Sequence, residues 1–167
     1  MRNKKISKTV NCAVFAAAIL VVTWLIKIPL PVVGYINAGD AVIVLCSFIM
    51  GPVWGGVAGA IGASLADLLS GYAMYIGATF IIKLLMGLLA GCVFNLLKRN
   101  NALIRSVISA ALAEVVMVFG YFVFEMYVLN LGSAAALNIP FNAIQGGVCI
   151  VFSVVFYMAI KNRLKLK

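Results

Sequence analysis

The chain has 167 residues, of which 65% are hydrophobic and only 10% are charged. Ordinary soluble domains carry about 25% charged residues, so this composition excludes a soluble globular domain and indicates a surface that is mostly in contact with lipid. The length is enough for about six membrane spans of roughly 20 residues with short loops. We therefore expect residues 1–167 to form a single integral membrane domain.

Apolar segments separated by turn residues predict an all-α membrane protein, a compact bundle of six transmembrane helices. The expected spans are 9–27, 39–50, 52–69, 74–97, 104–130 and 138–161. Pro29 and Pro31 interrupt the apolar sequence after the first span, so residues 28–38 are expected to form an outer loop. The second span is short for a full crossing, and Pro52 is well placed to begin the third helix.

Basic residues predict the orientation of the bundle. The net charge is +9, and most of the basic residues fall in three clusters. These are Arg2, Lys4, Lys5 and Lys8, then Lys98, Arg99 and Arg105, and finally Lys161, Arg163, Lys165 and Lys167. The positive-inside rule puts all three clusters, and so both the N- and the C-terminus, in the cytoplasm, which requires an even number of spans in each half. Because this charge marks helix ends, we do not expect nucleic-acid binding.

The sequence offers little material for metal or covalent chemistry. It has no histidine, and its four cysteines all lie inside apolar segments without a CxxC pair. They are Cys12, Cys46, Cys92 and Cys149. We therefore expect no metal, no cofactor and no disulfide framework. A phosphate-binding G-x-x-x-x-G-K-[ST] loop and a nucleophile elbow are also missing, so we expect neither an enzyme nor an ATPase.

Polar side chains concentrate at one end of the expected bundle. When the six spans alternate in direction, most polar residues fall in the outer half of the bilayer, and the inner half is apolar apart from Glu114. Polar groups inside a membrane commonly mark a solute site, so we expect a substrate pocket that opens to the outside. Its candidate residues are Asn37, Asp40, Tyr75, Thr79, Lys83, Tyr121, Glu125, Asn142 and Gln145.

Lys83 is the most informative candidate. It lies well inside the fourth span, where a lysine costs at least about 2.5–3.5 kcal/mol on membrane-insertion scales. A carboxylate partner can offset this cost, and Glu125, Asp40 and Asp67 are the available ones. A water-filled pocket or an anionic ligand group can do the same. A structural ion pair and a ligand contact are compatible with each other.

Amides and tyrosines at the same depth allow two interpretations. Asn142 and Gln145 are three residues apart and share one helix face, where they either join helices by hydrogen bonds or contact a ligand. The outer tyrosines either stack on a flat ring or form the aromatic belt of the membrane interface. These tyrosines are Tyr72, Tyr75, Tyr121 and Tyr127.

Small residues recur at helical spacing. Glycines at 51, 55 and 59, and again at 87 and 91, are four residues apart, a pattern that lets helix backbones approach closely in lipid. Ala13 and Ala17 form a similar face on the first span. The neighbour of that face is either another helix of this chain or a partner subunit.

Four sequence segments form a recognisable set: N-A-G-D at 37–40, G-P-x-x-G at 51–55, G-x-x-x-A-D-L-L-S-G-Y at 62–72 and T-F-I-I-K-x-x-M-G-L-L-A-G at 79–91. Together they resemble the substrate-binding S components of energy-coupling factor (ECF) vitamin transporters. Six spans and basic inner ends fit the same family along the whole length. The A-x-x-x-A motif of the family's first helix is matched by Ala13 and Ala17.

The resemblance implies a division of labour in a prokaryotic plasma membrane. The S component captures a vitamin or vitamin precursor from outside with high affinity, and an ECF transmembrane coupling protein with two ATPase subunits drives its release inward. The S component is thought to topple within the lipid, with Ala13 and Ala17 against the coupling protein. The core segments look most like the branch associated with pyridoxine or hydroxymethylpyrimidine, and riboflavin is the alternative substrate.

Two other classes of function make different predictions from the same residues. A self-sufficient carrier or channel would use Lys83 and the carboxylates as an ion path, and it would transport solute without ATPase partners. A structural or assembly protein would use the same charges to fix helix register, and it would bind no small molecule. The second of these leaves the outer clustering of polar residues unexplained.

Overall fold

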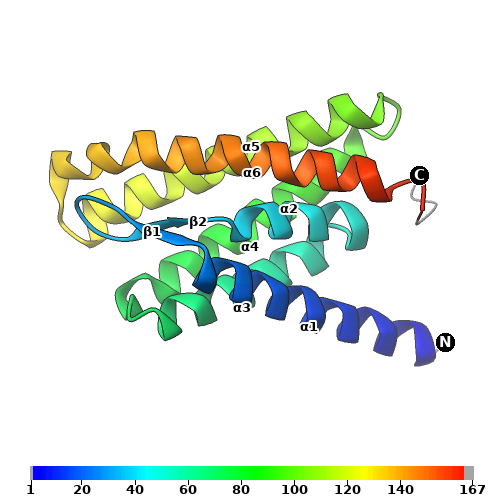
Figure 1. The fold of residues 1–167 in the computed structure, drawn as a ribbon, viewed down its shortest axis with the longest axis horizontal. Helices are drawn as coiled ribbons and strands as arrows, with labels where there is room; N and C mark the ends of the chain where they lie inside the picture. The colour runs from blue at the N-terminus through cyan, green and yellow to red at the C-terminus, as the bar shows by residue number, and fades with distance from the viewer. Residues whose placement is uncertain (1, 164–167) are drawn as a thin grey trace.

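The computed structural model describes residues 2–163, with side chains from residue 6 onward, and contains six α-helices in that range (Figure 1). The helices are α1 (Arg2–Leu25), α2 (Gly39–Met50), α3 (Pro52–Leu69), α4 (Ile76–Leu96), α5 (Ala102–Val123) and α6 (Ile139–Ile160). Five helical segments are long and apolar enough to cross a membrane, and α2 is shorter. The predicted all-α membrane bundle is therefore confirmed.

The connection between α1 and α2 differs from the irregular loop expected over residues 28–38. Strands β1 (Lys27–Pro29) and β2 (Tyr35–Asn37) pair antiparallel there. Leu30 N donates a hydrogen bond to Gly34 O and closes the turn between them. Short irregular helices complete the chain: η1 (Ala73–Tyr75), the π-helical η2 (Phe124–Val128) and η3 (Gly132–Asn138). The hairpin lies almost entirely in the predicted loop 28–38, η2 lies within the end of the predicted span 104–130, and η3 occupies most of the predicted loop before residue 138.

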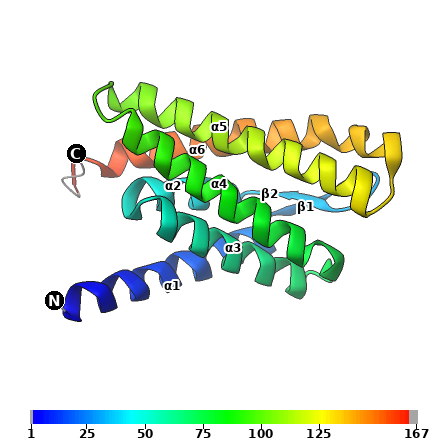
Figure 2. The ribbon, with the colours of Figure 1, turned by 180° about the vertical axis from the view of Figure 1, so that it is seen from behind.

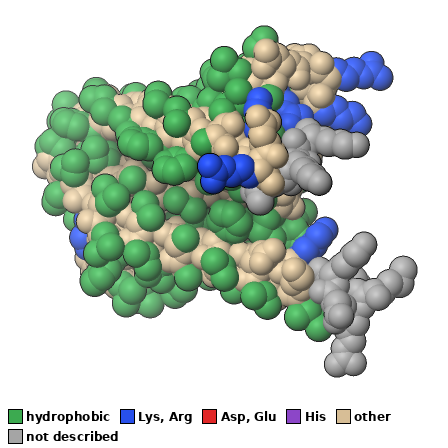
Figure 3. All heavy atoms as spheres, turned by 45° about the vertical axis from the view of Figure 1, so that its right-hand side comes forward, with side chains coloured by type: hydrophobic (Ala, Val, Ile, Leu, Met, Phe, Trp, Pro, Cys, Tyr) green, Lys and Arg blue, Asp and Glu red, His purple; other side chains and the backbone are tan. Residues whose placement is uncertain are grey.

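The two ends of the bundle differ in character. Both described ends of the chain lie at one end with the α2–α3 and α4–α5 turns, and the hairpin lies at the other (Figures 1 and 2). Figure 3 shows most lysine and arginine side chains gathered at the first end, on the right of the view, beside a lateral surface covered by hydrophobic side chains. We call these the basic end and the hairpin end. Lys165, Lys167 and the side chains of Arg2, Lys4 and Lys5 lie outside the described residues.

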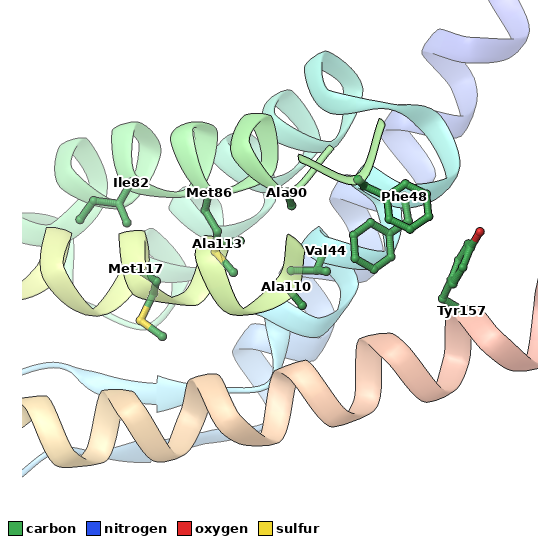
Figure 4. Close-up of a cluster of buried hydrophobic side chains, with 10 residues drawn as sticks. Val44, Phe48, Ile82, Met86, Ala90, Ala110, Ala113, Met117 and Tyr157 are labelled. Atoms are coloured by element: carbon green, nitrogen blue, oxygen red, sulfur yellow. The ribbon is translucent and has the colours of Figure 1, made fainter. Parts of the chain in front are cut away.

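The apolar core lies between α2, α4, α5 and α6 (Figure 4). Toward the basic end it is aromatic, because Phe48 stacks on Phe94 with ring centroids 4.2 Å apart and Tyr157 meets both rings edge-on. Arg105 is buried beside them, with its guanidinium carbon 4.1 Å from the centroid of Phe94 and Nη2 donating to Tyr157 Oη over 2.7 Å. Arg105, a member of one of the basic clusters that predict the orientation of the bundle, therefore also packs in the core.

Close packing of α3 on α4 depends on glycine. A Cβ atom added to Gly87 would lie 2.6 Å from Cα of Gly56, a distance that the two backbones cannot accept.

Helix α1 packs on α3 and α2 at the edge of the bundle. Only 22% of its apolar segment is buried, against 56% for α3, so α1 offers most of its surface to lipid or to a partner.

Candidate functional site

A cavity lies at the hairpin end, enclosed by the hairpin and the surrounding helices. We call it the outer cavity. Its lining residues are Thr23, Leu30, Gly34, Tyr35, Asn37, Ala63, Asp67, Tyr75, Thr79, Lys83, Tyr121, Glu125, Asn142 and Gln145. Its free volume is about 20 Å³, which is room for about one water molecule. The side chains of the wall therefore fill most of the space that they enclose.

A chain of polar contacts forms the floor of the outer cavity. Lys83 Nζ, on α4, donates to Asp40 Oδ1, on α2, over 2.6 Å. Gln145 Nε2, on α6, donates to Asp40 Oδ2 over 2.5 Å, and Gln145 Oε1 accepts from the backbone N–H of Asn37 over 2.6 Å. Lys83 and Asp40 are 1% and 0% exposed. Three helices and β2 are thus joined around one buried ion pair.

Lys83 also faces aromatic and hydroxyl groups. Its Nζ lies 5.1 Å from the ring centroid of Tyr121, within the range of a cation–π contact. The hydroxyl of Tyr121 is 3.0 Å from Thr79 Oγ1. Because an ammonium group has three N–H donors and Asp40 takes one of them, Lys83 keeps donors that can serve a ligand without breaking the ion pair.

Glu125 connects several elements at the hairpin end by hydrogen bonds. Tyr75 Oη donates to Glu125 Oε1 over 3.1 Å, and Asn138 Nδ2 donates to Glu125 Oε2 over 2.9 Å. The same Asn138 nitrogen also lies 3.1 Å from the backbone oxygen of Val33 in the hairpin turn. Glu125 belongs to the π-helical segment η2, a local geometry that is frequent at functional sites. It is therefore not the partner of Lys83.

The hairpin is attached to α3 by Tyr35, whose Oη donates to Asp67 Oδ1 over 2.5 Å. Burial and the neighbouring Asp67 carboxylate raise the pKa of Tyr35, so its hydroxyl stays a donor. Asp67 Oδ2 and Thr23 Oγ1 are buried and have no hydrogen-bond partner among the described residues. Both residues line the outer cavity, and both atoms can accept a hydrogen bond from a ligand.

The start of α2 depends on a glycine. Gly39 N donates to Asn37 Oδ1 over 2.9 Å, which forms an Asx turn where β2 leads into the helix. A Cβ atom at Gly39 would lie 1.9 Å from Thr23 Oγ1. Glycine therefore lets the Thr23 side chain of α1 approach the backbone of α2 beside Asp40, which lies in the first turn of this helix.

Eight of the nine predicted substrate-binding residues line the outer cavity. They are Asn37, Tyr75, Thr79, Lys83, Tyr121, Glu125, Asn142 and Gln145. The ninth, Asp40, lies behind Lys83 and Gln145 and orients them. Sequence reasoning missed Thr23 and Tyr35 as wall residues. It named Asp67 as a possible partner of Lys83 but not as a wall residue, although its place in the segment at 62–72 was a usable signal.

One group of possible metal ligands occurs among the described residues: Asp40, Glu114 and Cys149, with one ligand atom of each within 4.8 Å of the others. Both oxygens of Asp40 already accept hydrogen bonds, from Lys83 and Gln145. A cation would therefore have to displace an ammonium group or lie beside it. These contacts make the group a poor metal site.

A second feature lies on the outside of the bundle, where α1 meets α3. An apolar groove of about 440 Å³ is lined by Thr9, Cys12, Ala13, Ala16, Ala17, Leu20, Trp54, Val57, Ile61 and Leu65. Ala13 and Ala17 are both exposed in it. The predicted small-residue face of α1 is thus turned to the surface, and we call this groove the alanine groove.

Comparison with known proteins identifies the family. The sequence model of the family described as "ECF-type riboflavin transporter, S component" matches residues 3–162. The chain belongs to this family. An uncharacterized protein of Pyrococcus woesei is 36% identical to this S component over 120 residues, which cover 71% of this chain and 78% of that protein. The solved structure of the S component of a bacterial ECF transporter superposes with a TM-score of 0.71, at 21% identity over 99% of each chain.

The resemblance seen in the sequence is confirmed by this match. This S component is a substrate-binding subunit of an ECF transporter, and it is a multi-pass protein of the plasma membrane. It is a transporter subunit and not an enzyme. Membership of the family implies a small-molecule vitamin as substrate and an ECF module as partner.

Proposed function

We propose that the outer cavity captures a flat heteroaromatic vitamin from outside the cell, and that riboflavin is its substrate. The family description favours riboflavin over the pyridoxine or hydroxymethylpyrimidine that the sequence segments favoured. The observation that carries the proposal is the convergence of aromatic rings, amides and one buried lysine on a single cavity. Aromatic side chains together with well-placed polar groups that fix the orientation of the ligand are typical of small-molecule sites.

Each part of the wall has a role in this proposal. Tyr75 and Tyr121 offer ring faces to a flat heterocycle. Asn142 and Gln145 offer amide donors and acceptors to ring nitrogens and carbonyls, and Lys83 offers free ammonium donors to an electron-rich oxygen. Asp40 holds Lys83 and Gln145 in position, because it accepts one hydrogen bond from each.

The cavity must widen to admit this substrate. Sites for ligands of this size enclose about 300–1,000 Å³, whereas the outer cavity has a free volume of about 20 Å³. The hairpin covers the cavity, and a small number of side-chain contacts hold it: Tyr35 to Asp67 and Lys27 to Ser70 at α3, Asn138 to Val33 at η3, and Gln145 to Asn37 at α6. We infer that the hairpin swings outward when substrate enters.

The alanine groove is the proposed docking site for the ECF transmembrane coupling protein, whose two ATPase subunits supply the energy. Exposed alanines allow a partner helix to approach the backbone of α1 closely. The groove lies on α1 and α3, and the outer cavity opens at the hairpin end. Docking and substrate capture therefore use different surfaces of the same subunit.

Native mass spectrometry of the detergent-purified chain, followed by titration with riboflavin, pyridoxine and hydroxymethylpyrimidine, tests the proposal. Riboflavin should co-purify or bind and lose its fluorescence in the site. Asn142→Ala removes a cavity amide and should weaken binding at least tenfold, about 1.4 kcal/mol. The matched control, Asn95→Ala, changes an exposed amide at the basic end and should leave affinity unchanged.

Other outcomes redirect the proposal in defined ways. Binding of pyridoxine or hydroxymethylpyrimidine without riboflavin would keep the outer cavity and replace its substrate. Equal effects of the two asparagine variants would move the site elsewhere. Solute flux into vesicles that contain this chain alone would favour the self-sufficient carrier.

A further inference from the structure

Glu114 is a buried carboxyl group that the substrate-binding proposal does not use. It lies on α5 and is 3% exposed. Its side chain packs against α6 at Gly146, where an added Cβ would lie 3.1 Å from Glu114 Cβ. It also borders an apolar groove of about 620 Å³ between α5 and α6. On this side the carboxyl group is thus bordered by a groove whose lining is otherwise apolar.

Neither oxygen of Glu114 has a hydrogen-bond partner among the described residues. The other buried carboxyl groups differ in this respect. Asp40 accepts from Lys83 and Gln145, and Glu125 accepts from Tyr75 and Asn138. Asp67 accepts from Tyr35 at one oxygen, and only its other oxygen lacks a partner among the described residues. An ionised carboxylate can accept about four hydrogen bonds, and among the described residues no hydrogen bond stabilises the charged form of Glu114.

The charges that face Glu114 do not balance an anion either. The titratable groups around it are Asp40 on α2, Lys83 on α4 and Cys149 on α6. Lys83 is paired with Asp40 at 2.6 Å, so this pair is already neutral. An ionised Glu114 would add a second carboxylate beside Asp40 in an apolar environment, where an isolated charge costs several kcal/mol or more.

We propose that Glu114 is a proton-binding site of this S component, and that it is held as a neutral carboxylic acid while the outer cavity is closed. A proton fits the site better than a metal ion, because it needs one oxygen and leaves the Lys83–Asp40 pair intact. Loss of the proton would create an anion that competes with Asp40 for Lys83. The state of Glu114 therefore controls the position of Lys83 in the cavity wall.

Infrared spectroscopy of the full chain in a carbonyl-free detergent, without ligand, tests the protonation directly. The sequence has only four Asp and Glu residues, so the carbonyl-stretch band of a protonated carboxyl group can be assigned by single substitutions. At neutral pH we expect one such band, shifted by exchange into heavy water, lost in Glu114→Gln and kept in Glu125→Gln. Since glutamine imitates the neutral acid, Glu114→Gln should also keep its thermal stability.

Two results would overturn the proposal. The first is the absence of a protonated-carboxyl band in the unchanged protein at neutral pH, which needs no variant and so does not depend on folding of Glu114→Gln. The second is a band that survives Glu114→Gln and disappears when another carboxyl is replaced. Only the link to Lys83 and substrate rests on the proposed function. A chain that binds no vitamin can still show the band, so the two proposals fail separately.

Discussion

Lys83 Nζ and Asp40 Oδ1 lie 2.6 Å apart, and neither side chain is more than 1% exposed. A buried charge that loses its partner costs about 3–5 kcal/mol, whereas replacement of the whole pair by apolar groups is often neutral. The free energy of unfolding is therefore expected to fall when one of the two charges is removed, and to change little when both are replaced by apolar groups. Ligand binding, in our proposal, depends on the ammonium group itself.

This difference separates a structural role of Lys83 from a ligand contact. We expect Lys83→Met alone to lower the free energy of unfolding by about 3–5 kcal/mol and to abolish riboflavin binding. The double variant Lys83→Met with Asp40→Leu should recover most of the stability and still not bind. Thermal unfolding in detergent and fluorescence titration measure the two effects. A double variant with normal affinity would make the pair purely structural.

Gly39 offers a test of the contact between α1 and α2. Gly39→Ala would bring a Cβ within 1.9 Å of Thr23 Oγ1, so we expect a lower melting temperature and at least tenfold weaker binding. Adding Thr23→Ala should restore part of both losses, because the clashing oxygen is gone. Gly77→Ala is the matched control, since an added Cβ at Gly77 meets nothing within 4 Å. Equal behaviour of the two alanine variants would argue against a tight contact.

The bond from Tyr35 to Asp67 should control how fast the outer cavity opens. A hydrogen bond to a charged group contributes about 1.5–3 kcal/mol, so Tyr35→Phe should speed riboflavin dissociation about tenfold or more. Hydrogen exchange of the hairpin amides should rise in parallel. Tyr127→Phe, at a tyrosine that is 67% exposed, serves as the control. Unchanged dissociation in Tyr35→Phe would mean that another element admits the substrate.

The alanine groove separates coupling from capture. Bulky replacements such as Ala13→Trp or Ala17→Trp should leave riboflavin affinity within about twofold, because both residues are exposed and far along α1 from the cavity. Uptake by vesicles with the complete ECF module should fall to background. Val14→Trp, at an exposed position that does not line the groove, should keep most of its uptake. Loss of binding in the alanine variants would assign these residues to internal packing.

Much of the fold and the candidate site follows from hydropathy and topology. The turn at Gly51 and Pro52 and the helices on either side agree with the expected spans, since α2 ends at Met50 and α3 begins at Pro52. Alternating spans bring polar residues at the same depth together. This is why residues as distant in sequence as Asn37 and Gln145 were expected at one site, and they are hydrogen-bonded.

Other features needed the three-dimensional structure. Three carboxylates were available to Lys83, and the side-chain directions that select Asp40 leave no trace in spacing alone. The sequence places Thr23 in an apolar span without marking it as a site residue, because one hydroxyl group barely changes the local hydropathy. The hairpin brings Tyr35 to Asp67 through strand pairing, which a loop rich in proline does not predict. The unpartnered state of Glu114 is likewise a property of its neighbours.

The short length of α2 has a consequence for the direction of transport. Asp40 stands in its first turn and the helix ends at Met50, so only about 15 Å of helix, at 1.5 Å per residue, separates the ion pair from the basic end. In our proposal, cargo held at Lys83 therefore starts about halfway across a hydrocarbon layer of roughly 30 Å. The remaining half is closed by the aromatic cluster in which Phe48 stacks on Phe94 and Tyr157 meets both rings edge-on. A passage through the protein would take this seal apart, whereas movement of the intact bundle leaves it closed.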